Sequence, residues 1–279
     1  MPLDYLVPAD VAAAVEMRGA GCVVLAGGTD LYPQHVGRPL TQPVADIGGL
    51  SELRGIEETA DGHRIGALTR WADVAAAALP GCFDGLRAAA REVGSVQVQN
   101  AGTVGGNLCN ASPAADGIPP LLTLDASVEL TSVAGRRVVP LEDFLTGYRQ
   151  TALRSDELLT AVLVTRGAED AQSAFLKLGL RRSLVISVVM VAVVVAVDAH
   201  GRVAEARVAV GACSPVAQRL RSLESVLVGR STNDVDAATI AEHLSSLSPI
   251  DDVRATSDYR LEAASVLVQR ALASCGGDR

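Results

Sequence analysis

A polar, glycine-rich stretch at positions 99–116 interrupts an otherwise apolar chain, and it reads QNAGTVGGNLCNASPAAD. Glycine has no Cβ, so Gly105 and Gly106 can adopt positive φ and bring backbone N–H groups close to anionic oxygens. Three neutral hydrogen-bonding side chains accompany them, at Thr103, Asn107 and Ser112. The stretch therefore predicts a loop that binds phosphate without a lysine.

A second glycine turn lies upstream, where AGGTDL at positions 26–31 follows the apolar run CVVL at 22–25. Two loops of this kind suit a ligand with two phosphate groups. Neither loop matches G-x-G-x-x-G or a P-loop, and no strand-helix-strand unit with an acidic residue follows the first one. The sequence therefore argues against a Rossmann domain.

The two loops, in this order, resemble those of the FAD-binding subunits of the molybdenum hydroxylases, a family that includes xanthine dehydrogenase and carbon monoxide dehydrogenase. Further segments are similar to family segments: IGALTRWADV at 65–74, FLKLGLRR at 175–182, SDYR at 257–260 and VQRAL at 268–272. Together these segments extend, in order, over nearly the whole chain.

This resemblance implies non-covalently bound FAD, with molybdopterin and [2Fe–2S] clusters on partner subunits only. It places Asp116 near the ribose or adenine and Asp30 beside the flavin end. It places Lys177 near the isoalloxazine, where a cation would favour the reduced, anionic flavin. No catalytic or metal-ligating residue is predicted. The predicted cofactor-binding residues are Leu25, Ala26, Gly27, Gly28, Thr29, Asp30, Leu31, Thr103, Gly105, Gly106, Asn107, Ser112, Asp116, Leu158 and Lys177.

Simpler interpretations stay open for several of these residues. Asp116 could cap a helix that starts near Gly117. Asp30 could be a solvated turn residue, and Lys177 could be an ordinary surface lysine. Cys109 invites a covalent-flavin or redox role, but a small buried residue is the better interpretation.

One segment departs from the family pattern. Many members carry an acidic residue shortly after the Arg-Arg pair, whereas this chain has SLVI at positions 183–186. Control of the acceptor site by such an acid is therefore not expected here. The pair Arg181-Arg182 is expected to form a solvated or subunit-facing surface.

Composition excludes several classes of function. With 49% hydrophobic and 20% charged residues the chain is expected to be globular, and its net charge of −8 argues against nucleic-acid binding. The five cysteines form no C-x-x-C pair and the four histidines show no metal-ligand spacing. An intrinsic zinc or iron–sulfur site is therefore not expected. The odd number and wide spacing of the cysteines, with the lack of a visible signal peptide, predict a cytoplasmic protein. The apolar run 184–197 is too short to span a bilayer.

The order of predicted elements indicates an α+β fold. Helices are expected at 9–18, 71–79, 86–93 and 259–273, and strands at 22–26, 44–47, 157–164 and 188–197. Hairpins are expected at 55–66, 127–139 and 188–210. The polar stretch 166–172 suggests a domain boundary, with residues 1–168 as the FAD-binding domain, in two lobes of about 1–55 and 56–168, and residues 169–279 as a second domain. The resemblance implies a vanillyl-oxidase/MurB-like (PCMH-type) N-terminal domain and a smaller C-terminal domain of antiparallel sheet with helices.

The sequence thus predicts an FAD-binding electron-transfer subunit of a molybdopterin-dependent hydroxylase or dehydrogenase. Its partners would be a small iron–sulfur subunit, a large molybdopterin subunit that holds the substrate, and an external electron acceptor. Two alternatives stay open. One is a stand-alone FAD-dependent oxidoreductase of the same fold, for which convergent polar residues in the second domain are few. The other is a scaffold subunit without flavin, which the intact glycine loops disfavour.

Overall fold

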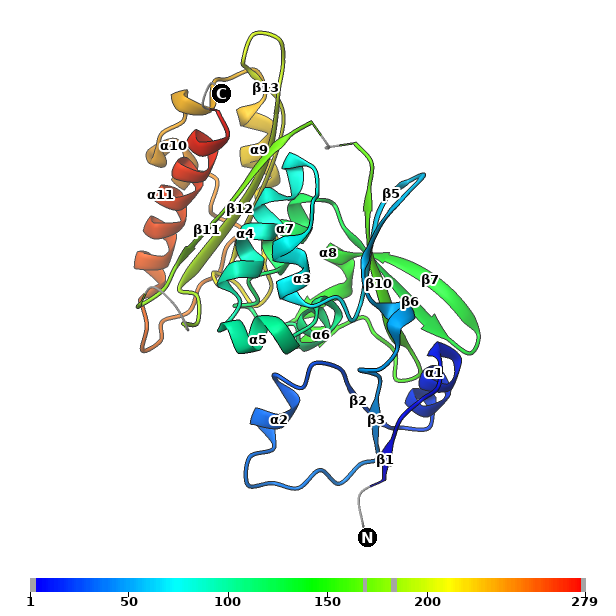
Figure 1. Cartoon of the computed structure of the whole chain (residues 1–279). Coiled ribbons are helices and arrows are strands. Elements are labelled where there is room, and N and C mark those ends of the chain that lie inside the picture. Colours follow the sequence, from blue (N-terminus) through cyan, green and yellow to red (C-terminus); the bar gives the residue numbers. More distant parts are fainter. Residues whose placement is uncertain (1–3, 168–169, 182–184, 277–279) are drawn as a thin grey trace.

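The computed structural model describes residues 4–167, 170–181 and 185–276. Helices and strands are mixed throughout, and three main sheets follow one another along the chain. Figure 1 shows a small N-terminal lobe in blue below a central body, with a layer of sheet and helix built from the C-terminal part beside that body. The mixed α and β architecture agrees with the prediction.

The N-terminal lobe contains a parallel sheet of β1 (Tyr5–Leu6), β3 (Val44–Asp46) and β2 (Val23–Leu25), in that order. Its helices are α1 (Val11–Gly19) and α2 (Leu31–Gln34). The side chain of Asp10 accepts a hydrogen bond from the N–H of Ala13 at 2.8 Å, so this residue caps α1. The first glycine loop therefore joins the end of β2 to α2.

The central sheet is antiparallel and has the order β4-β5-β10-β6-β7. Its strands are β4 (Ile56–Thr59), β5 (Gly62–Gly66), β6 (Ser127–Ser132), β7 (Gly135–Pro140) and β10 (Leu158–Thr165). The helices between β5 and β10 are α3 (Trp71–Ala76), α4 (Asp84–Glu92), α5 (Val96–Ala101), α6 (Val104–Asn110), α7 (Ile118–Thr123) and α8 (Leu141–Phe144). A short hairpin of β8 (Leu145–Gly147) and β9 (Gln150–Thr151) precedes β10.

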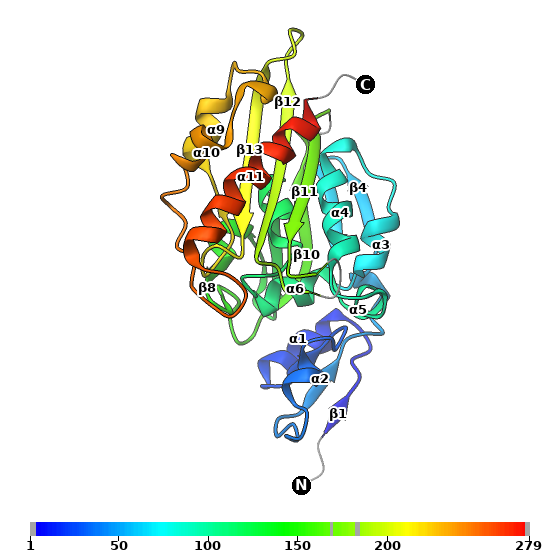
Figure 2. The same ribbon diagram turned by 90° about the vertical axis from the view of Figure 1, so that its left-hand side faces the viewer.

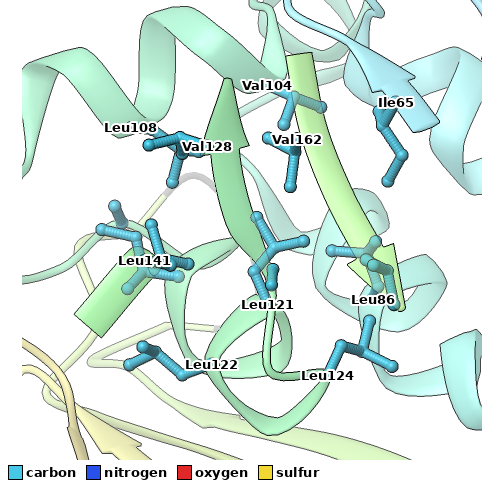
Figure 3. Close-up of a cluster of buried hydrophobic side chains, with 14 of the residues drawn as sticks. Ile65, Leu86, Val104, Leu108, Leu121, Leu122, Leu124, Val128, Leu141 and Val162 are labelled. Carbon is cyan, nitrogen blue, oxygen red and sulfur yellow. The ribbon is translucent and has the colours of Figure 1, made fainter. Parts of the chain in front are cut away.

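Helix α6 is anchored in the core of this central body. Figure 3 shows Val104 beside Val162 of β10 and Leu108 beside Val128 of β6. Both α6 side chains are fully buried, so the apolar face of the helix is fixed against the sheet. The opposite face of α6 is left toward the N-terminal lobe.

The C-terminal sheet is antiparallel, with β11 (Gln172–Leu178), β12 (Val189–Val197), β13 (Val203–Gly211) and β14 (Gln218–Arg219) in sequential order. The helices α9 (Arg221–Leu227), α10 (Ala237–Ala241) and α11 (Ser257–Cys275) complete this part. Figure 2 shows α11 crossing in front of β11, β12 and β13. Helices α4 and α7 contact the same sheet from the central body, which explains why β12 is apolar on both faces.

Two buried arginines tie the C-terminal sheet to its surroundings. Arg219 donates to Glu224 from Nε and Nη2, and to Asp125 of the central body from Nη1 at 2.6 Å. Arg260, at the start of α11, donates to the carbonyl oxygens of Val188 and Ala212 and to Asp252. Because both guanidinium groups are almost fully buried, these bonds fix how the elements pack.

The predicted strands and hairpins formed, with ends shifted by a few residues. One prediction of local structure was wrong. The stretch 99–116 is not one loop, because it contains the end of α5 and all of α6. The polar stretch 166–172 lies between two strands, since β10 ends at Thr165 and β11 begins only at Gln172 and pairs with β12. The predicted boundary between 168 and 169 lies outside the described residues.

Arg260→Met is expected to lower the free energy of unfolding by about 3 kcal/mol, because it removes a buried guanidinium that pairs with Asp252 and leaves the carbonyls of Val188 and Ala212 without this donor. The matched control is Arg254→Met, since Arg254 pairs with the same Asp252 but is about one-third exposed. The control should cost less than about 1 kcal/mol. Urea unfolding checks both values, and equal losses would contradict the role of burial.

Candidate functional site

A cavity of about 520 Å³ lies where the two glycine segments meet. One wall comes from the first loop and its strand, and the other comes from α6 and the start of β10. The site therefore lies between the N-terminal lobe and the central body (Figure 1). The predicted cofactor-binding residues that line it are Ala26, Gly27, Gly28, Thr29, Asp30, Leu31, Thr103, Gly105, Gly106, Asn107 and Leu158.

Two glycines give the first loop its shape. Gly28 has φ of 70°, and a Cβ there would meet the ring of Tyr32 at 2.5 Å. A Cβ on Gly27 would lie 2.0 Å from the carbonyl oxygen of Ala101. The loop thus packs directly on the backbone that leads into α6, which only glycine permits at this position.

The backbone N–H groups of this loop are free to bind a ligand. Within the described part of the chain, those of Gly27, Gly28 and Thr29 donate to no other backbone group. Because they lie in a loop that lines the cavity, they form a set of donors for an anionic oxygen. Such donors are what the predicted phosphate-binding role of the first loop would require.

The second glycine segment works differently from the prediction. Gly105 and Gly106 lie in the first turn of α6 and do not have positive φ. Their N–H groups are already used, since Gly105 donates to the Ala67 carbonyl at 2.8 Å and Gly106 to the Oγ1 of Thr103 at 3.1 Å. A Cβ on Gly105 would lie 2.8 Å from the Cβ of Ala67. The glycines here allow close packing rather than an exposed row of donors.

Asn107 gives this second wall a polar group that points to a ligand. Its Oδ1 is buried and has no hydrogen-bond partner in the described structure. The residue also lines the cavity, one turn into α6. A buried amide oxygen without a donor is costly, so a bound molecule with an O–H or N–H group would complete this site.

Asp116 and Lys177 lie against each other and do not line the cavity. Lys177 Nζ donates to Asp116 at 2.7 Å and to the Glu92 carbonyl at 3.2 Å, and Ser187 Oγ donates to the other carboxylate oxygen at 2.7 Å. Burial raises the pKa of the Asp116 carboxyl, and Lys177 and Ser187 oppose that rise. Lys177 is therefore not the surface lysine of the simpler interpretation. The cluster joins the central body to the C-terminal sheet.

The structure also shows where several other residues singled out in the sequence lie. Asp116 does not cap α7, whose N-cap is Gly117 and has no side-chain cap bond. Cys109 is exposed and lines the cavity, so the prediction of a buried residue was wrong. Leu25 and Ser112 do not line the cavity either, and the Ser112 side chain accepts from the N–H of Ala114. Arg182 of the predicted arginine pair lies outside the described residues.

The structure adds two charged residues that sequence reasoning missed, Glu157 and Arg18. Glu157 accepts two bonds from Arg137, at 2.6 and 2.8 Å, and one from the N–H of Arg154 at 2.8 Å. These partners lower the pKa of Glu157 below its usual value, and the hydrogen bonds from Arg137 contribute most. An acid at the first position of a predicted strand was the available signal for Glu157.

The lining residues contain no arrangement for acid–base or nucleophilic chemistry. Glu157 is held by Arg137, and Asp30 is exposed at the start of α2. No group of three or more His, Cys, Asp or Glu side chains among the described residues could hold a metal ion. The geometry is that of a binding site for an extended, anionic molecule.

Comparison with known proteins identifies the family. Residues 1–165 match the model described as the FAD binding domain in molybdopterin dehydrogenase, and residues 174–275 match the C-terminal domain of the carbon monoxide dehydrogenase flavoprotein. The chain belongs to this family. It is thus an FAD-binding oxidoreductase subunit, as the sequence predicted.

Individual relatives agree with this assignment. The chain is 38% identical to the nicotinate dehydrogenase FAD-subunit of Eubacterium barkeri, over 74% of this chain and 71% of that protein. It is 33% identical to a putative xanthine dehydrogenase FAD-binding subunit of Escherichia coli, over 91% and 90%. A carbon monoxide dehydrogenase structure from Hydrogenophaga pseudoflava superposes with a TM-score of 0.91 at 28% identity, over 99% and 97%.

The residues present fit FAD. The free N–H groups of the first loop suit a pyrophosphate, because they supply positive dipoles where no lysine lines the cavity. The orphaned Oδ1 of Asn107 suits a hydroxyl or N–H of the same molecule.

Gly27→Ala is expected to lower the flavin content of the purified protein at least tenfold, because the new Cβ would overlap the Ala101 carbonyl and push the loop out of place. Gly49→Ala is the matched control, since a Cβ there meets nothing within 4 Å and its φ is not positive. The flavin-to-protein absorbance ratio gives the answer. Normal flavin content in Gly27→Ala would show that this loop does not hold the cofactor.

Glu157→Gln is expected to lower the free energy of unfolding by about 2 kcal/mol at pH 7, because Arg137 loses its charged partner. The pKa of Glu157 is lowered in the folded state, so its stabilisation is present above the unfolded pKa of about 4.3 and is lost as pH falls through the lower folded value. The deficit should therefore be constant from about pH 7 to 5 and shrink below about pH 4.

The matched control for this change is Glu57→Gln, at an exposed position of β4. Urea unfolding at several pH values compares the two variants. A deficit in Glu157→Gln no larger than that of the control would contradict the assigned role of the Arg137 pair.

Proposed function

We propose that this chain holds FAD in the cavity between its two glycine segments and passes electrons from iron–sulfur clusters on a small partner subunit to an external acceptor. A large molybdopterin subunit of the same complex would oxidise the organic substrate. The observation that carries the proposal is the cavity itself, where free backbone donors of the first loop face an orphaned amide oxygen of α6.

FAD supplies the redox chemistry when bound, and the protein supplies binding, geometry and electrostatics. In this proposal Gly27, Gly28 and Thr29 bind the pyrophosphate through their N–H groups. Asn107 accepts a hydrogen bond from the cofactor, and Leu158 contacts it from the start of β10. These roles need no covalent bond, so the flavin is held non-covalently.

Asp116 and Lys177 act indirectly in this proposal. Lys177 donates to the carbonyl of Glu92, and the next residue, Val93, lines the cavity. The buried pair therefore positions one wall of the site from the C-terminal sheet. Its position does not support the direct contacts with ribose and isoalloxazine that the family resemblance implied.

The finer assignments belong to the same proposal. The N-terminal part would be a PCMH-type domain of residues 1–168 with two lobes, followed by a domain of residues 169–279; the separate sheets in these regions support that division. No helix in the described part of the chain is long and apolar enough to cross a membrane. No disulfide bond joins the cysteines of the described structure, which supports a place in the reducing cytoplasm.

The isolated chain is expected to be reduced by dithionite but to oxidise no organic substrate, because its cavity contains no metal site and no acid–base pair. Co-expression with candidate iron–sulfur and molybdopterin subunits should yield one complex on size-exclusion chromatography with substrate-dependent dye reduction. Substrate turnover by the isolated chain would overturn the electron-transfer assignment in favour of a stand-alone flavoenzyme.

A further inference from the structure

Arg18 adds a positive charge to a cavity that the predicted cation, Lys177, does not line. It lies in the last turn of α1 and lines the cavity, half-buried. Among the described residues, its guanidinium has one hydrogen bond, from Nη1 to the Cys22 carbonyl, at a long 3.4 Å. It forms no ion pair with a described residue, and the lining acid Glu157 is already held by Arg137. The guanidinium is therefore available to a ligand.

Strand β2 and helix α6 show where Arg18 lies along the cavity. Its guanidinium is hydrogen-bonded to the carbonyl of Cys22, which precedes β2, whereas the first glycine loop follows β2. About 13 Å of strand therefore separates the guanidinium from the loop. Cys109, at the end of α6, lines the same cavity as Arg18. The first loop packs near the beginning of α6, about 10 Å away along the helix.

Arg18 thus lies well beyond the phosphate-binding loop, toward one end of the cavity. Val93 and Val98 line the cavity from the side of α5, whose end contacts the first loop, beside the carbonyl that Lys177 binds. A molecule whose pyrophosphate rests on the first loop would extend one arm toward each end. Arg18 therefore faces one of the two ring systems of FAD and not its phosphates.

The strand beside this end offers a backbone edge for a purine. Strand β10 pairs with β6 from Leu158 on, but with β5 only from Ala161 on. Within the described structure, the edge of β10 at Leu158 that faces away from β6 therefore has no strand partner. Adenine carries an amino donor and ring-nitrogen acceptors side by side, which suit a free backbone carbonyl and N–H.

We infer that Arg18 stacks on the adenine ring of FAD and is a cofactor-binding residue of this chain. This inference rests on the proposed FAD site. A guanidinium plane is attracted to the electron-rich face of an aminopurine, and Arg is the side chain best suited to such stacking. The oxidised isoalloxazine is electron-poor, so a cation over its face would gain less. Arg18 thereby selects the dinucleotide FAD over a flavin that lacks adenine.

The test uses the full-length chain. After its flavin is removed, the chain is titrated with FAD and binding is followed by fluorescence. The reduction potential of the bound flavin is then measured. Arg18→Ala is expected to weaken FAD binding about tenfold, or ~1.4 kcal/mol. Arg18→Gln, which keeps most of the side-chain length, should show the same loss. The flavin potential should not change, because the charge lies away from the isoalloxazine. Arg230→Ala, at an exposed position in the C-terminal part, is the control for net charge.

Each outcome decides a different claim. Unchanged FAD affinity in both Arg18 variants would overturn the inference. Weaker binding together with a lower flavin potential would place Arg18 at the isoalloxazine and would also overturn it. Failure of the wild-type chain to bind FAD would instead overturn the proposed function. Circular dichroism and melting temperature show whether each variant is folded. If Arg18→Ala is not folded, the binding measurement is made on Arg18→Gln.

Discussion

The contact between Gly27 and the carbonyl oxygen of Ala101 determines the geometry of the whole site. Because no side chain separates them, the first loop lies directly on the backbone that enters α6. This contact connects the N-terminal lobe to the central body, whose core holds α6 through Val104 and Leu108. A cavity with open backbone donors on one wall and Asn107 on the other follows from this arrangement.

Buried charges connect the C-terminal sheet to the same site. Lys177 and Ser187 bind Asp116, and Arg219 binds Asp125, so polar groups from β11 to β14 reach into the central body. Buried pairs of this kind are costly to desolvate and strongly destabilising to break, so they favour one packing arrangement over others. The wall formed by Glu92 and Val93 is thereby fixed by the C-terminal part of the chain.

The sequence predicted the strands and the first loop well because their signals are local. The apolar run before AGGTDL and the alternation in the hairpins follow directly from strand periodicity. It failed at α6, because glycine and asparagine are poor helix formers and only the burial of Val104 and Leu108 makes the helix stable. It also missed Arg18, since an arginine in α1 gives no sign of the cavity that it reaches after the chain turns back into β2. The partnership of Asp116 with Lys177 depends on packing between distant segments, which no local pattern shows.

The central claim is that this chain itself binds FAD, without a covalent bond, in the described cavity. The most direct measurement is the identity and amount of flavin in the purified chain, expressed without partner subunits and precipitated with acid. The account predicts that FAD appears in the supernatant in a near-equimolar amount. Absence of flavin, release of FMN instead of FAD, or flavin that stays with the precipitated protein would contradict it.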